Sequence, residues 1–267
     1  MCNQCADGGM PMPLDLEDQP RVLFANNPLR LVAAQIRFTP LFALSEPQTI
    51  ARLQTRLADA YPLLETDEDV ADLATGLVTP PDRWMNRGLW RFESEDRAWS
   101  IVVTLDSVGL EASRYRRYEE FAERAEALFA AVIDTLGIRR RTRFGIRYVD
   151  EIVHPEAQSV AQWERFLRRD LLGLAAGELL SPYVESTAQL IDLALDDGRM
   201  GIRHGYRKED GGPLYFIDLD AYDPEPRQLD IEEVMARMAR YKRWSWNFFR
   251  ASITDELAAF LRPEPLS

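Results

Sequence analysis

The feature that most constrains this fold is an order of elements that occurs twice along the chain. In each half the residue pattern predicts one strand, then a helix, then three short strands, then a long helix. Both opening strands, near residues 29–38 and 142–152, have the alternating pattern of a half-buried strand. The two closing helices, near 118–136 and from Val234 to Phe249, place apolar residues at helical spacing. The halves share little residue identity, so the repeat is one of element order.

This order predicts an α+β protein built as one continuous domain. Two strand–helix–three-strand–helix units, 23–140 and 141–267, are expected to form a curved antiparallel sheet of about eight strands with helices on one face. Duplicated helix-grip folds, such as the TATA-binding-protein-like group, have this shape. Residues 1–22 are polar, contain glycine and proline and lack a hydrophobic period, which predicts a flexible N-terminal arm.

Several element ends can be predicted from local signals. Ser45, with Gln48 three residues on, predicts a capping box at the start of a helix that stops near Tyr61. The acidic stretch 65–76 is expected to be a loop. Gly137 is expected to end the helix that precedes it.

In the second half, residues 160–175 are predicted to form one helix. A break or kink is expected before the final stretch 252–261.

The composition limits the classes of partner. Lys and Arg number 32 against 44 Asp and Glu, so the formal net charge is −12. A field of that sign repels phosphate backbones, which makes nucleic acid an unlikely partner. No run approaches the roughly 18 apolar residues of a membrane span, and no secretory signal pattern opens the chain. With only two cysteines, the sequence predicts a cytoplasmic protein without a membrane partner.

Charged and polar residues on the predicted strands form the first candidate site. Two arginines share one face of the 142–152 strand, and the opposing strand carries a glutamine and an arginine on its polar face. The full set, which also includes three aspartates of the second half, is Gln35, Arg37, Arg143, Arg147, Asp192, Asp218 and Asp220. One interpretation is an internal ion-pair network across the sheet. The other is a concave surface where guanidinium groups bind carboxylates or phosphates.

Familiar catalytic signatures are missing from the sequence. His154 and His204 are the only histidines, and no GxSxG, HExxH or glycine-rich phosphate loop occurs. Asp150 and Glu151 lie near His154, but adjacent strand residues point to opposite faces. The aromatic and basic stretch 240–250 has its aromatic residues at core spacing, which predicts a core helix.

Cys2 and Cys5 form a CxxC pair outside the predicted core. One interpretation is a tail whose thiols have no role. The other is an arm presented to a metal, to a dimer mate or to an enzyme that modifies cysteine peptides. A full zinc site needs two further ligands, which only a partner or a second copy would supply. A cofactor is therefore not predicted, and a metal shared through these cysteines stays an alternative.

Three stretches carry a resemblance to a known group of proteins: NPLRLVAAQIRF, RTRFGIRYVDEI and FFRASITDEL. Their order and spacing resemble a sporadically distributed bacterial family without an established activity, over about residues 26 to 260. The resemblance implies a bacterial α+β protein built as a single unit. It implies no catalytic residues, and the CNQC leader is not part of it.

Two functional hypotheses follow. The first is a non-enzymatic binding or accessory protein that docks a bacterial protein partner, or a second copy of itself, through its sheet face or its cysteine arm. The second is an enzyme or enzyme subunit that uses the arginine–aspartate face or the Cys2–Cys5 dithiol in metal or thiol chemistry. The lack of a catalytic signature favours the first.

Overall fold

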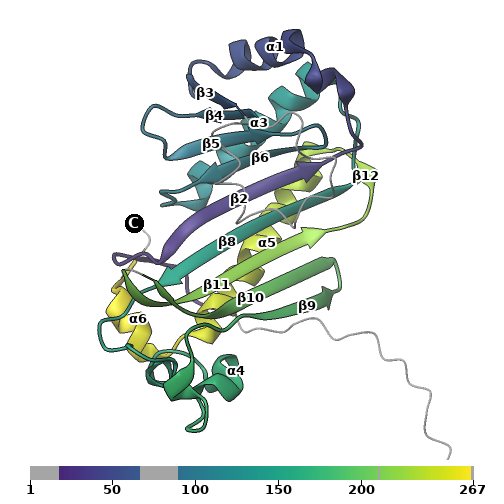
Figure 1. Cartoon of the computed structure of the whole chain (residues 1–267). Coiled ribbons are helices and arrows are strands. Elements are labelled where there is room, and N and C mark those ends of the chain that lie inside the picture. The colour runs from purple at the N-terminus through teal and green to yellow at the C-terminus, as the bar shows by residue number, and fades with distance from the viewer. Residues whose placement is uncertain (1–17, 67–89, 210, 266–267) are drawn as a thin grey trace, which may run out of the picture.

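An antiparallel sheet of nine strands forms the centre of the structure (Figure 1). The computed structural model describes residues 18–66, 90–209 and 211–265. The strands of the sheet lie in the order β3-β4-β5-β6-β2-β8-β11-β10-β9. Their bounds are β2 Leu29–Arg37, β3 Leu63–Thr66, β4 Trp90–Glu93, β5 Trp99–Val103, β6 Ser107–Ala112, β8 Arg143–Ile152, β9 Gln189–Leu195, β10 Gly198–Glu209 and β11 Gly212–Asp223.

Two small ladders and a layer of helices complete the described fold. β1 (Val22–Phe24) pairs with β13 (Pro263–Pro265), and β7 (Arg140–Arg141) pairs with β12 (Arg227–Gln228). The α-helices are α1 Pro47–Leu57, α3 Tyr118–Leu136, α4 Arg169–Leu172, α5 Ile231–Ser252 and α6 Asp255–Leu261. Short 3-10 segments occupy Phe42–Ser45, Val160–Arg165, Gly173–Ala176 and Ser181–Tyr183.

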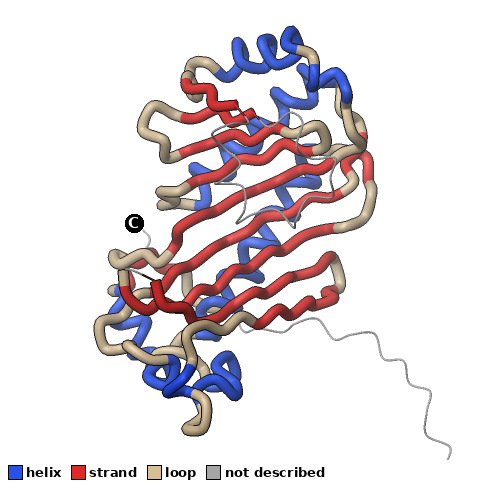
Figure 2. Tube along the Cα trace, viewed as in Figure 1, coloured by secondary structure: helices blue, strands red, loops and turns tan. Residues whose placement is uncertain are grey.

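The long helices α3 and α5 lie on one face of the curved sheet (Figures 1 and 2). We call this the covered face, and we call the opposite face, which no described helix covers, the open face. Side chains on strands alternate between the two faces. The sequence prediction of an α+β protein with a large, curved antiparallel sheet is therefore confirmed.

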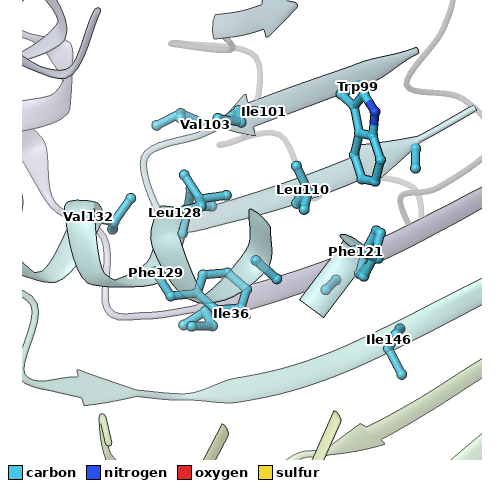
Figure 3. Packing of buried hydrophobic residues seen from close by; sticks show 14 of the residues in the cluster. Ile36, Trp99, Ile101, Val103, Leu110, Phe121, Leu128, Phe129, Val132 and Ile146 are labelled. Carbon is cyan, nitrogen blue, oxygen red and sulfur yellow. The ribbon is translucent and has the colours of Figure 1, made fainter. Parts of the chain in front are cut away.

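The core lies between the covered face and the helices. On β2 the alternating residues Val32, Ala34 and Ile36 are buried, as their period predicts. Figure 3 shows side chains of α3, among them Phe121 and Phe129, beside the apolar residues of the neighbouring strands. Burying a side chain of this size contributes about 1.5–3 kcal/mol, so the amphipathic helices hold the sheet from one side.

The two halves of the chain meet at the centre of the sheet. β2 pairs antiparallel with β8, in a register that sets Ala33 opposite Arg147 and Ile36 opposite Phe144. β6, β5 and β4 follow on the side of β2, whereas β11, β10 and β9 follow on the side of β8. The sheet has one strand more than the predicted eight, because β3 adds to the β4 edge.

Several predicted boundaries need correction in the first half. Ser45 does not cap a helix: its hydroxyl donates to the carbonyl of Phe42 at 2.6 Å within a 3-10 turn, and α1 begins at Pro47. That helix ends at Leu57, before the predicted stop at Tyr61. Residues 65–66 of the predicted acidic loop belong to β3, and 67–76 lie outside the described residues.

The segment 160–175 is not the single helix that its apolar pattern predicts. It consists of a 3-10 turn, the four-residue α4 and another 3-10 turn. Leu167 forms an isolated bridge with Ile253, which takes its backbone out of a helix. Gly173 then ends α4 at a positive φ of 51°, a conformation that favours glycine.

The predicted break before the last helix is confirmed. α5 ends at Ser252, and the hydroxyl of Thr254 caps α6 by accepting from the backbone N–H of Leu257 at 3.3 Å. Gly137 ends α3 in the left-handed region, as expected.

The predicted flexible arm over 1–22 does not include its last five residues. The Asn247 side chain donates to Asp18 at 3.0 Å and accepts from the backbone N–H of Gln19 at 3.2 Å. Val22 belongs to β1. Residues 1–17, with Cys2 and Cys5, lie outside the described residues.

Candidate functional site

The predicted arginine–aspartate set lies on the open face of the sheet. On β8, Arg147 forms two hydrogen bonds with Asp218 of β11, Nε to Oδ1 and Nη2 to Oδ2, each 2.6 Å long. Arg143 donates to Asp220 at 2.6 Å. Burial acts to lower the pKa of Arg147, but the contact with Asp218 outweighs it and the pKa is raised. Both arginines of β8 thus already have carboxylate partners within the sheet.

The rest of the set is only partly brought together. Gln35 accepts a hydrogen bond from Arg37 at 3.1 Å, and Arg37 lies opposite Arg143 in the β2–β8 register. Burial, and next the charge of Arg143, lower the pKa of Arg37. Asp192 lies apart on β9, exposed and opposite Gly201. A ligand on this face would have to compete with ion pairs that are already formed.

The two histidines are structural. His154 lies between two aromatic rings, with its ring centroid 3.8 Å from that of Phe166 and 4.1 Å from that of Phe260. His204 is buried, and its Nδ1 lies 2.8 Å from the hydroxyl of Tyr215. Burial lowers the pKa of both histidines. Among the described residues, no group of three or more His, Cys, Asp or Glu side chains could hold a metal ion.

A cavity of about 120 Å³ lies on the covered face. β8 contributes Tyr148 and Asp150, because these residues have the opposite phase to Arg147 on the same strand. The other walls come from the segment 21–24, from 115–119 at the start of α3 and from α5. The cavity therefore joins parts of the chain that lie far apart in sequence.

Asp150 is the unusual residue of this cavity. Its exposed fraction is 2 %, and within the described part of the chain no hydrogen bond or ion pair reaches its carboxyl group. Burial raises its pKa to about 8, and the charge of Asp218 acts in the same direction. At neutral pH the group is therefore mostly protonated, so that it presents one hydrogen-bond donor and one acceptor to the cavity.

Tyrosines surround the inner end of the cavity. The hydroxyl of Tyr148 is buried beside the side chain of Tyr115, with which it interacts. The ring of Tyr115 meets that of Tyr148 edge-on, with centroids 6.1 Å apart. Burial raises the pKa of Tyr148 and of Tyr115, so both stay neutral phenols. The inner end thus offers aromatic rings and, in the described part of the chain, the carboxyl group of Asp150 without a partner.

The outer end of the cavity is basic. Arg21, Arg116, Arg117 and Lys242 line it, with Glu119 as the acidic neighbour. Burial, followed by the charge of Arg21, lowers the pKa of Lys242 to about 8, although Glu119 opposes the shift. The Lys242 ammonium lies 5.4 Å from the centroid of the Tyr118 ring. This arrangement favours a negatively charged group at the mouth.

The sequence analysis placed Asp150 on a strand but did not include it among the candidate site residues. The sequence does hold a sign of its burial: Asp150 follows Phe144, Ile146 and Tyr148 at every second position of β8, and those three residues are buried. A charged residue in an apolar phase is a candidate for function or for an internal ion pair. Only the three-dimensional structure distinguishes the two.

No described helix combines the length and the apolar character needed to cross a membrane.

Comparisons with other proteins do not assign the chain to a family. No protein-family model matches the chain, and no curated protein matches its sequence.

Proposed function

We propose that this is a non-enzymatic binding protein that holds a small organic molecule in the cavity of the covered face. The observation that carries the proposal is Asp150, a buried carboxyl group without a partner that lines the cavity. An unpaired buried carboxyl group costs stability, so its presence is best explained by a ligand that pairs with it.

The test uses 1-anilinonaphthalene-8-sulfonate, a fluorescent anion with an aromatic body. It is expected to bind the folded protein once per chain, because the cavity combines aromatic walls with a basic mouth. Ser245→Leu fills the cavity from α5 and is expected to weaken binding at least 10-fold, whereas Ala236→Leu, exposed on the same helix, leaves it unchanged. Equal binding to all three proteins would contradict the proposal.

Ser245 is buried, so its substitution can also disturb folding. Leu29→Trp narrows the cavity from β2, where Leu29 is only half-buried, and supplies a second blocking variant. Unchanged dye binding in a folded Leu29→Trp protein would count against the cavity in the same way.

Docking of a protein partner remains a second candidate function. Exposed apolar side chains occur on β9 and in the segment before it: Leu174, Leu179, Leu180, Tyr183, Leu190 and Ile191. Such a group is typical of interaction surfaces. Native mass spectrometry of protein purified from its host tests this candidate. A stable complex that is lost in Leu179→Ser with Leu190→Ser would support it, and a monomer in both proteins would oppose it.

We also propose that the chain belongs with the bacterial family that it resembles, acts in the cytoplasm and arose by duplication of a helix-grip unit. The pairing of β2 with β8, with three strands following on each side before β3 is added, supports the duplication. Chemistry on the arginine–aspartate face is the less favoured alternative, since Arg143 and Arg147 are already paired.

A further inference from the structure

We propose that the ligand of the cavity is amphoteric, with a protonated amine against Asp150 at the inner end and an anionic group against Lys242 and Arg21 at the mouth. This inference rests on the proposed function and names its ligand class. Three features of the cavity support it, one for each end of the ligand and one for its middle.

The inner end favours a cation over a neutral group. Asp150 is 2 % exposed, and no basic side chain of the described residues pairs with its carboxyl group. The charge that acts on its pKa is another carboxylate, Asp218 of β11. An ammonium group would form a charge-assisted hydrogen bond with Asp150, and the neighbouring rings of Tyr115 and Tyr148 would add cation–π attraction.

The outer end favours an anion. Four basic residues and one acidic residue, Glu119, line the mouth. The backbone N–H groups of the first turn of α3, a helix of 19 residues without a side-chain cap, lie at the same place and add positive potential. The two ends of the cavity therefore carry opposite preferences.

The middle of the cavity is apolar. Phe24, Trp246 and Phe249 form a cluster with ring centroids 6.0 to 6.3 Å apart, and Leu219 of β11 lies on the sheet side. These walls suit a ring or a short hydrocarbon chain between the two charged groups. The ligand class is thus an amine and an anionic group joined by an apolar spacer.

Binding of such a ligand is expected to release a proton from Asp150. In the free protein Asp150 holds its proton at neutral pH, while the amine in solution is already an ammonium ion. When they pair, the carboxyl group releases its proton to the solvent and becomes a carboxylate. With the Asp150 pKa at about 8, about 0.9 proton per ligand is released at pH 7.

The groups around Asp150 are not expected to release a proton when the ligand binds, so the released proton is assigned to Asp150. Tyr148 and Tyr115 stay protonated, and Asp218 is paired with Arg147. At the mouth, burial and then the charge of Arg21 lower the pKa of Lys242 to about 8, and the charge of Glu119 opposes this shift. An anion at the mouth would favour the protonated form of Lys242. On binding, this group would therefore take up protons rather than release them.

The experiment compares three probes of matched shape: 4-(aminomethyl)benzoate, 4-methylbenzoate and benzylamine. Displacement of 1-anilinonaphthalene-8-sulfonate gives relative affinities, and calorimetry at pH 7 in phosphate and in Tris counts the protons. We expect 4-(aminomethyl)benzoate to bind at least 10-fold more tightly than either other probe. Benzylamine, which does not reach the mouth, is expected to release close to one proton, and 4-methylbenzoate none.

Two variants test which residue binds the amine and which binds the anionic group of the ligand. Asp150→Asn is expected to remove proton release and to lower the affinity ratio of 4-(aminomethyl)benzoate to 4-methylbenzoate at least 10-fold. Lys242→Met is expected to lower the ratio of 4-(aminomethyl)benzoate to benzylamine. Ala236→Leu, on the exposed side of α5, should change neither ratio.

The outcomes separate this inference from the proposed function. If 4-methylbenzoate binds as tightly as the amino compound, without proton release by any probe, the amphoteric ligand is wrong while the cavity still binds small molecules. If neither the dye nor any probe binds, the proposed function itself is wrong.

Discussion

The two faces of β8 differ in whether their acidic side chains have partners. On the open face, Arg147 and Asp218 are joined by two hydrogen bonds of 2.6 Å. On the covered face, three residues further along, Asp150 is more deeply buried and has no partner within the described chain. Both positions follow from the same alternation of a strand. The paired charges of the open face serve the sheet itself, whereas the unpaired buried carboxyl group of Asp150 is the basis of the ligand site that we propose.

The largest effect is expected from breaking the matched pair. Arg147→Ala leaves the carboxylate of Asp218, whose side chain is 8 % exposed, without its partner. We expect the free energy of unfolding to fall by about 3 kcal/mol, as measured by urea unfolding.

A double variant supplies the control for that prediction. Arg147→Met with Asp218→Leu replaces both charges by apolar groups and should recover more than half of the loss. A loss below about 1 kcal/mol in Arg147→Ala would contradict the structural role of the pair.

A pH-dependent effect is expected from the unmatched carboxyl group. The pKa of Asp150 is about 8 in the folded protein but close to 4 in the unfolded chain. Between these values the folded state holds a proton that the unfolded state has lost, so this residue makes stability fall as pH rises from 4 to 8 and adds no further change above 8. Asp150→Asn removes the effect.

Thermal unfolding at pH 5 and pH 9 measures the difference. The Tm of Asp150→Asn relative to wild type should rise by about 5 °C or more between the two pH values. Asp192→Asn, which changes an exposed aspartate of β9, should show no such rise. A constant difference between Asp150→Asn and wild type would mean that Asp150 is ionised and paired in the folded protein.

The smallest effect is expected at the more exposed pair of the open face. In the pair of Arg143 with Asp220, the aspartate side chain is 37 % exposed, so water screens the interaction. Arg143→Ala should lower the free energy of unfolding by about 1 kcal/mol or less in the same urea experiment. A loss as large as that of Arg147→Ala would show that burial does not separate the two pairs.

Much of the sheet can be predicted from the sequence, because alternation is a local property. The opening strands show their period directly, and Gly137 marks the end of α3. The segment 160–175 is different, since a long-range bridge from Leu167 to Ile253 overrides its helical pattern. Ser45 fails as a cap for a local reason: its hydroxyl bonds backward to Phe42 rather than forward.

The candidate site is harder to predict than the fold. The two ends of the cavity are formed by residues of four separate segments: Arg21, Tyr118, Asp150 and Lys242. Only the packing of the folded chain brings these segments together. The sequence identifies the charged residues of the open face, since they repeat along strands. It does not tell which of them find partners, because that depends on the register of β8 with β11.

The pKa of Asp150 in the free protein is the most direct test of the proposed ligand site. Carbon-13 NMR of protein labelled at the aspartate carboxyl carbon, with Asp150→Asn to assign the resonance, follows this one group through a titration. We predict a midpoint near pH 8, which falls when 4-(aminomethyl)benzoate is added. A midpoint close to the ordinary aspartate value of about 4 would mean that the carboxyl group is already paired, and would contradict the ligand site.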